Sequence, residues 1–388
     1  MANTRRAYWD AGSAAPLHPV GRDALLAALD DGWADPRRLH HEGRRASLLL
    51  SGARESVAAV LGARTEEVTF APSHTHALHT AVLGALKGRR RAGSALVASA
   101  VEHSAVLGAG QRHVADGGEM RLLDVDRLGR VDDAAMAAAL REPGVAVAAL
   151  QLANGEVGTV QPVDAVHSAA RATGVPLVVD AGAAVGHIAV PASWDLLAAD
   201  GHSWGGPPGV GVLAVRTGIR FSSPWPPDEA EQGRAPGGVS VPAALACAAV
   251  LVEVSRSLAA EDARRRALVD RLRAAVPGLV PDVEVVGDPS DRMPHVLTFS
   301  CLFADGEALV TELDRAGFAV GSGSACTAST LEPSHVLAAM GVLTGGNVRV
   351  ALPGGMPEGV LEGDVERFLA VLPEAVGRVR AMLGGDLL

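Results

Sequence analysis

Residues 145–180 read VAVAALQLANGEVGTVQPVDAVHSAARATGVPLVVD, and this stretch decides the fold class. Two short apolar runs, at 145–150 and 176–180, flank an amphipathic stretch at 163–173. The runs do not alternate apolar with polar residues, which is typical of strands buried on both faces of a parallel sheet. A strand, a helix and a strand in this order predict an α/β fold that binds ligands at the carboxyl ends of its strands.

The same pattern extends outward from this unit, from about residue 55 to 215. A Pro- and Gly-rich connection follows at 221–238, and a long helix is expected from Pro242 to about Ala275. Three further strand-like runs, at 283–286, 295–299 and 348–352, alternate with helical patterns. They predict a second, smaller α+β lobe after the large α/β unit.

Composition narrows the classes of function. The chain has 388 residues, of which 48% are hydrophobic, so it is long enough for two domains. Its net charge is −10 and its basic residues form no run longer than three, as at 89–91, which argues against nucleic acid and anionic membranes as partners. No run approaches the ~20 apolar residues of a transmembrane helix, and no apolar signal core follows the first residues. We therefore expect a cytoplasmic protein.

Five segments resemble one known family when taken in order. They lie at 8–16, 35–43, 101–103, 179–185 and 321–326, and the last reads Gly-Ser-Gly-Ser-Ala-Cys. Their order and spacing are similar to those of cysteine desulfurases with a long cysteine loop, within the class V aminotransferase superfamily. The resemblance covers about residues 8 to 370.

The resemblance implies the pyridoxal-phosphate-dependent transferase fold type I. This α/β fold has a large domain with a mostly parallel seven-stranded sheet and a small α+β C-terminal domain. The expected boundaries are an N-terminal segment at 1–20 that packs with the small domain, a large domain at 21–255, and a small domain at 256–388 that carries the cysteine loop.

The resemblance also implies a reaction, in which L-cysteine yields L-alanine and leaves a persulfide on the loop cysteine. Pyridoxal phosphate is the cofactor that accepts electrons in this family. By position, Cys326 matches the nucleophile and His103 the histidine that stacks on the cofactor ring. Asp180 matches the aspartate that pairs with the pyridine nitrogen. Arg349 matches the arginine that binds the substrate carboxylate, a task suited to a planar bidentate donor.

Three more positions carry over from the same motifs. Thr75 is the residue that remains from the polar core of the phosphate loop, which here reads Ala-Pro-Ser-His-Thr-His at 71–76. His202 fixes the frame of the cofactor-binding stretch. The family asparagine that contacts the ring hydroxyl aligns with Gly155 in this chain. Asn154 is the residue just before it, and we predict that Asn154 binds substrate.

Ser203 occupies the position of the lysine that holds the cofactor. A hydroxyl cannot form an imine, and it is a poor base for the substrate proton. The one lysine of the chain, Lys87, is expected at an exposed helix end. Asp200 replaces a serine that contacts the phosphate, and a buried carboxylate would repel that group. The sequence therefore predicts that any pyridoxal phosphate is not held as a lysine Schiff base.

Three functions stay open on these residues. The first is a desulfurase-like protein without cofactor catalysis that accepts or relays sulfur on Cys326, or serves as partner of an active desulfurase. The second is an active cysteine desulfurase that binds pyridoxal phosphate non-covalently. The third is a different enzyme or binding protein that takes a small molecule in the pocket that holds the cofactor in the family.

Partners and metals follow from the same positions. The family forms homodimers, so we expect a homodimer or a heterodimer with an active desulfurase, and a sulfur-acceptor protein fits the thiol chemistry. The spacing of His74, His76 and His79 is not that of a usual helical metal pair, and no metal site is predicted. Cys247 and Cys301 are expected to be packing residues.

Overall fold

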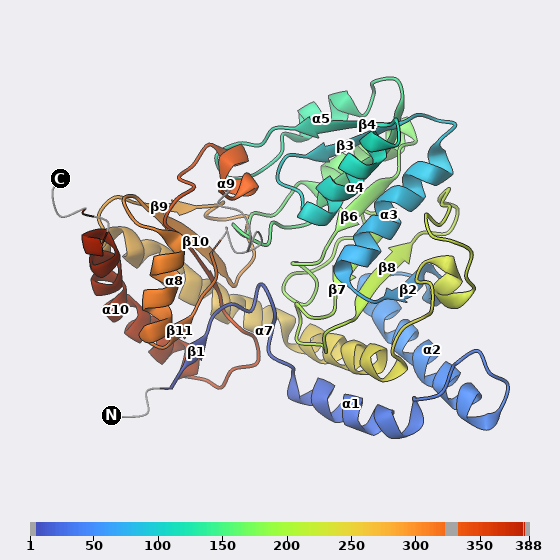
Figure 1. Ribbon diagram of the computed structural model, residues 1–388, viewed down its shortest axis with the longest axis horizontal. Helices are drawn as coiled ribbons and strands as arrows, with labels where there is room; N and C mark the ends of the chain where they lie inside the picture. The colour runs from blue at the N-terminus through green and yellow to red at the C-terminus, as the bar shows by residue number, and fades with distance from the viewer. Residues whose placement is uncertain (1–4, 323–332, 383, 385–388) are drawn as a thin grey trace.

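The computed structural model describes residues 5–322, 333–382 and 384, and it has two lobes (Figure 1). The large lobe holds a seven-stranded sheet with the order β2-β8-β7-β6-β5-β3-β4. Its strands are β2 (Val68–Ala71), β3 (Ala95–Ser99), β4 (Glu119–Leu123), β5 (Val145–Gln151), β6 (Leu177–Asp180), β7 (Leu196–Asp200) and β8 (Gly211–Val215). Only β8 runs antiparallel to its neighbours, β2 and β7. The predicted fold class is therefore confirmed.

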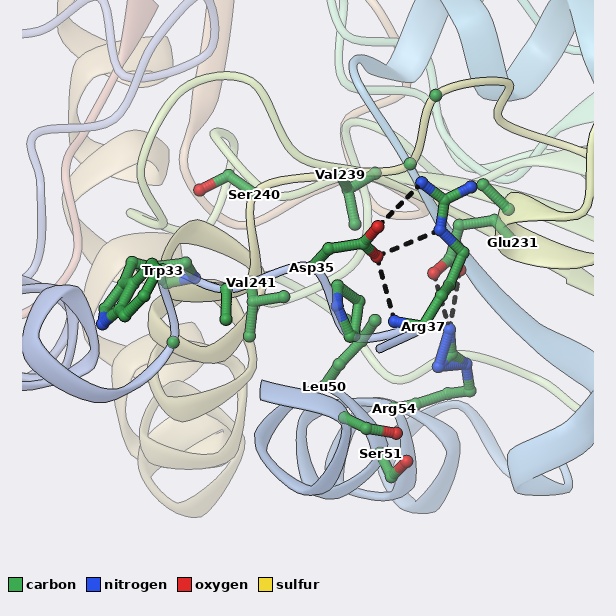
Figure 2. A pocket seen from close by; sticks show the side chains of 18 of the residues that line it. Trp33, Asp35, Arg37, Leu50, Ser51, Arg54, Glu231, Val239, Ser240 and Val241 are labelled. Atoms are coloured by element: carbon green, nitrogen blue, oxygen red, sulfur yellow. Dashed lines mark hydrogen bonds and ion pairs between the residues drawn. The ribbon is translucent and has the colours of Figure 1, made fainter. Parts of the chain in front are cut away.

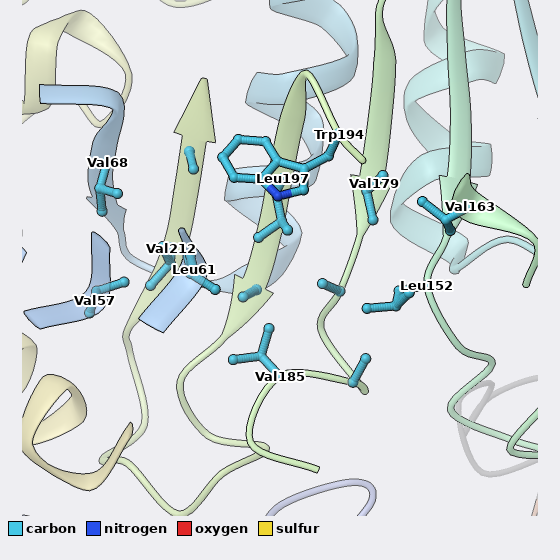
Figure 3. Packing of buried hydrophobic residues seen from close by; sticks show 14 of the residues in the cluster. Val57, Leu61, Val68, Leu152, Val163, Val179, Val185, Trp194, Leu197 and Val212 are labelled. Atoms are coloured by element: carbon cyan, nitrogen blue, oxygen red, sulfur yellow. The ribbon is translucent and has the colours of Figure 1, made fainter. Parts of the chain in front are cut away.

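Helices cover both faces of this sheet, because alternate side chains of each strand enter two different cores. Leu177 and Val179 of β6 face one core, and Val178 faces the other. Figure 3 shows part of the first core, where Val57 lies near the sheet. Each fully buried side chain of this size contributes about 1.5–3 kcal/mol to folding. The helices around the sheet are α2 (His41–Leu61), α3 (His74–Arg89), α4 (Ser104–Ala115), α5 (Asp133–Ala139) and α6 (Val163–Thr173).

The small lobe packs around a second sheet and an aromatic core. Trp9, Phe318 and Phe368 meet there with ring centroids 5.0–5.3 Å apart. Near the start of the chain, β1 (Ala7–Tyr8) pairs in parallel with β11 (Phe318–Ala319). The remaining elements are β9 (Val283–Val286), β10 (Val296–Cys301), β12 (Asn347–Ala351), α8 (Gly306–Arg315), α9 (His335–Met340) and α10 (Val360–Met382).

One long helix, α7 (Val241–Leu279), belongs to both lobes. Leu251 packs in the core of the large lobe, and Leu272 packs in the core of the small lobe. The predicted domain boundary near residue 255 stays a prediction, and it falls inside this helix. Among the described residues, α7 is the one helix long and apolar enough to cross a membrane by length and composition. The packing of both its ends into protein cores accounts for that apolar character.

Short elements complete the large lobe. Helix α1 (Pro19–Asp31) packs on α7, and 3₁₀ turns lie at η1 (Thr65–Glu67) and η2 (Ala230–Gly233). The segment 221–238 has η2 as its one described helical turn, as its Pro- and Gly-rich sequence predicts.

Two buried histidines lie where the lobes meet. The rings of His187 and His295 stack with centroids 3.9 Å apart. His187 Nδ1 accepts from the Arg265 guanidinium at 3.1 Å, and its Nε2 donates to the carbonyl of Ser203 at 2.9 Å. Burial and the positive charge of Arg265 lower the pKa of His187 to about 3, and burial beside His187 lowers the pKa of His295 well below its ordinary value. Both imidazoles are therefore neutral in the folded protein at neutral pH.

We predict that this histidine pair makes the fold sensitive to acid. An unfolded histidine binds a proton near pH 6.5, whereas the folded pair resists protonation, so stability falls as the pH drops below about 6.5. The expected slope is about 1.4 kcal/mol per pH unit for each histidine, measured by chemical denaturation at a series of pH values. His295→Phe keeps the stacked ring and removes one titrating group, so its slope should be shallower. Parallel curves for the two proteins would contradict this prediction.

Candidate functional site

The candidate site lies at the carboxyl edge of the parallel strands. Asp180 ends β6 and Asp200 ends β7, the neighbouring parallel strand, so the two carboxylates leave the sheet at the same edge. His103 follows β3 and caps the start of α4. The site therefore combines loops from three strands of the large sheet.

Asp180 is already paired within the protein. His74 Nε2 lies 2.8 Å from Asp180 Oδ1, and the backbone N–H of Gly182 donates to the same oxygen at 2.8 Å. The two side chains are nearly buried, at 12% and 7% exposed. Burial disfavours both charges, but the pair outweighs it: the pKa of His74 is raised and the pKa of Asp180 is lowered. The arrangement is a buried histidine–carboxylate pair in which each partner favours the charged form of the other.

His103 completes a three-residue cluster with this pair. Its ring meets the His74 ring edge-on, with centroids 5.3 Å apart. Its Nδ1 accepts from the backbone N–H of Ala105 at 3.0 Å, which orients the imidazole at the start of α4. The sequence singled out His103 and Asp180 for a shared site, and the structure brings them to the same cluster. The sequence did not predict that His74 would be their common neighbour. The available signal was the presence of a histidine at this position of the phosphate loop.

Ser203 lies in the turn that follows β7 and is 7% exposed. Its hydroxyl donates to the backbone carbonyl of Asp200 at 2.9 Å, and the Asp200 carboxylate accepts from the backbone N–H of His202 at 3.2 Å. The carbonyl of Ser203 receives the hydrogen bond from His187. The turn thus uses the polar groups of Ser203 for its own shape and for contact with the lobe boundary.

Arg349 lies on β12 in the small lobe, where its side chain contacts the N-terminal segment. Its guanidinium donates to Asp10 at 3.0 Å and also to the hydroxyl of Ser13. Its Nε is buried and has no hydrogen-bond partner among the described residues. A buried free donor on an arginine suits a carboxylate ligand, in keeping with the role that the resemblance gives Arg349. Burial raises the pKa of nearby Glu156, and the charge of Arg349 opposes that rise.

Two other predicted site residues are Asn154 and Thr75. The Asn154 amide donates to the carbonyl of Val101 at 3.2 Å, and its oxygen accepts from the N–H groups of Glu156 and Val157 at 2.9 Å each. Its polar atoms therefore hold the loop after β5. Thr75 is exposed in the first turn of α3. The predicted roles of both residues in binding stay predictions.

Cys326 lies outside the described residues. The other two cysteines are buried, Cys247 in α7 and Cys301 at the end of β10. Burial raises the pKa of Cys301 to about 11 and raises that of Cys247 further, so neither is a ready thiolate. Lys87 is exposed near the end of α3, where its ammonium donates to the carbonyl of Ser223 at 2.7 Å. It lies at a helix end, as the sequence predicts.

A separate cavity of about 710 Å³ opens between α2, the start of α7 and the loop before α7 (Figure 2). Two ion pairs border it: Arg37 with Asp35 at 3.0 Å, and Arg54 with Glu231 at 2.7 Å. Trp33 lies at its side. None of the predicted site residues that the structure describes lines this cavity. Its charges are already paired with one another, so we do not assign the chemistry of the site to it.

The comparisons with known proteins identify the family. The profile of the aminotransferase class-V family matches residues 7–353. The chain is 35% identical to a cysteine desulfurase of Cereibacter sphaeroides over 97% of both chains. It is 32% identical to the cysteine desulfurase NifS of Azotobacter vinelandii, over 92% of this chain and 89% of that one. A solved structure of a NifS-like protein shares the fold, with a TM-score of 0.87 at 23% identity over 96% of this chain and 100% of the other. The chain therefore belongs to the class-V aminotransferase family, whose members depend on pyridoxal phosphate, and within it to the cysteine desulfurases.

Proposed function

We propose that this chain keeps the desulfurase fold without pyridoxal-phosphate catalysis, and that it accepts or relays sulfur on Cys326 or acts as partner of an active desulfurase. The residues present do not fit the family cofactor. Ser203 has no amine, and its hydroxyl is bonded to the carbonyl of Asp200. The Asp200 carboxylate stands where the resemblance expects a phosphate contact, and like charges repel there.

The observation that carries the proposal is the state of Asp180. A pyridine nitrogen would need this carboxylate as its partner, but His74 holds it at 2.8 Å. The contacts of His74 and Gly182 are to Oδ1, so a pyridine ring would have to bond Oδ2 beside the imidazole or displace it. Displacement would leave one charge of the buried pair without a partner, which costs about 3–5 kcal/mol. Together with the missing amine at Ser203, this favours a site that does not take up the cofactor.

Sulfur transfer to Cys326 needs no cofactor on this chain. The Cys326 thiolate would attack the outer sulfur of a persulfide on a donor protein. A new S–S bond forms as the donor S–S bond breaks, and the donor leaves as its thiolate, so no oxidant is consumed. The Gly- and Ser-rich sequence around Cys326 suits an arm that exchanges sulfur with a partner. We keep the cytoplasm as the proposed compartment, because free thiols persist in reducing compartments.

The first test of the proposal is covalent capture of the cofactor. Protein incubated with pyridoxal phosphate and reduced with borohydride should carry no pyridoxyl adduct at residue 203, because a hydroxyl forms no imine. Peptide mass spectrometry measures this, and Lys87→Arg is the control that removes the one lysine side chain. Alanine release from cysteine by the wild-type protein, dependent on pyridoxal phosphate, would instead support the active desulfurase with a non-covalent cofactor.

A second prediction concerns the thiol. Incubation with an active desulfurase and ³⁵S-cysteine should place label on this chain, and Cys326→Ala should lose at least 90% of it, or roughly tenfold, because one thiolate carries the sulfur. Cys247→Ala and Cys301→Ala are matched controls that should keep the label, because both thiols are buried. If Cys326→Ala were labelled at the wild-type level, or if the wild type took no label from several donors, only the partner role would remain.

We also propose that the chain works as a dimer, with a second copy or with an active desulfurase. Large apolar side chains are exposed on α1, on the connection after it and on α2, from 49% for Leu26 to 86% for Leu39. The set is Leu26, Leu29, Trp33, Leu39 and Leu48. Exposed apolar residues gathered on neighbouring elements are typical of a protein interface.

Trp33→Glu should therefore weaken the dimer. Trp33 is 69% exposed, and loss of an interface tryptophan commonly costs about 2 kcal/mol, or roughly 30-fold in the dissociation constant. Sedimentation equilibrium measures this constant. Val114→Glu changes an apolar residue of α4 that is 45% exposed and should leave the constant unchanged. Equal effects of the two substitutions would argue against this surface.

A further inference from the structure

We infer that His74 is a built-in occupant of the place that the cofactor ring takes in active desulfurases. The inference rests on the proposed function and adds a cause to it: the site is filled from within by an imidazole. A ligand that could replace this side chain would be a small planar nitrogen heterocycle with a positive charge, such as imidazolium.

The contacts of His74 place it there. By the resemblance, the ring of the cofactor bonds Asp180 and lies against His103. The His74 imidazole has both neighbours: its Nε2 is 2.8 Å from the Asp180 carboxylate, and its ring meets the His103 ring at 5.3 Å, edge-on rather than stacked. Asp180 and Asp200 are the acidic side chains that act on its charge. One planar nitrogen ring thus has the two neighbours expected of another.

The backbone around the imidazole is shaped to admit it. A Cβ atom on Gly182 would lie 2.3 Å from the His74 ring, so no larger residue fits there without a shift. Ser73 caps α3 by accepting from the N–H of His76 at 3.1 Å, which fixes the first turn that carries His74. Gly182 also donates its N–H to Asp180. The loop at 180–182 therefore provides both the space for the His74 ring and the carboxylate that pairs with it.

The charge of His74 needs Asp180 in return. A cation at the start of a helix opposes the helix dipole, and His74 is the first residue of α3. The Asp180 carboxylate is 7% exposed, so water does little to stabilise it once the imidazole is removed. Each partner thus depends on the other.

The experiment is cavity complementation with imidazole. His74→Ala should lower the melting temperature by roughly 5–15 °C, because it leaves Asp180 buried and unpaired. Imidazole at pH 6 should restore at least half of that loss, because it binds the folded state alone. His79→Ala is the matched control: it removes a histidine of the same helix that has no ion pair among the described residues, and imidazole should not stabilise it. A rescue equal in both variants, or an unchanged melting temperature for His74→Ala, would overturn the inference.

Gly182→Ala keeps the test decisive if His74→Ala does not fold. Its methyl group should displace the ring and lower the melting temperature, whereas Gly108→Ala, where a Cβ atom would meet nothing within 4 Å, should not. No loss in the single variant would overturn the inference. The outcome is separate from the proposed function: uptake of pyridoxal phosphate with release of alanine by the wild type would refute that function. If imidazole failed to rescue His74→Ala and the wild type took up no cofactor, only the role of His74 would be refuted.

Discussion

The burial of the Asp180 carboxylate is the constraint on which the site depends. Asp180 ends an apolar strand in the middle of the sheet, where an ionised group without a partner is costly. In this protein the partner is His74, brought in by the first turn of α3, and Gly182 supplies both the space and a backbone donor. A pyridine ring at this carboxylate would have to share it with the imidazole or displace the imidazole.

The turn that carries Ser203 links the large lobe to the contact between the lobes. Its hydroxyl closes the turn on Asp200, and its carbonyl receives the hydrogen bond of His187. His187 in turn contacts Arg265 of α7 and His295 next to β10. The position that resembles the cofactor lysine is therefore tied to the contact between the lobes, and a change there acts on the packing of both.

The two halves of desulfurase chemistry are separable in physical terms. Activation of the substrate needs an electron sink held at a ring site, and that site depends on Asp180 and on an amine where Ser203 now lies. Exchange of sulfur between thiols needs only an accessible thiolate and a donor. A chain can lose the first and keep the second, because the residues concerned lie in different segments. Arg349 fits either state, since its guanidinium is held by Asp10 and retains a free buried donor.

The sequence alone determined the fold class, because apolar runs without alternation and the helix between them predict buried parallel strands, and 145–180 forms them as β5, α6 and β6. It also placed Asp180 at a strand end and showed that Ser203 lacks an amine. Only the tertiary structure decided which side chain Asp180 meets, since His74 lies 106 residues away along the chain. It likewise committed the Asn154 amide to its own loop and stacked His187 on His295. Periodicity reports which face a residue occupies, but a partner across the sheet edge is set by how distant loops pack, and no local pattern records that.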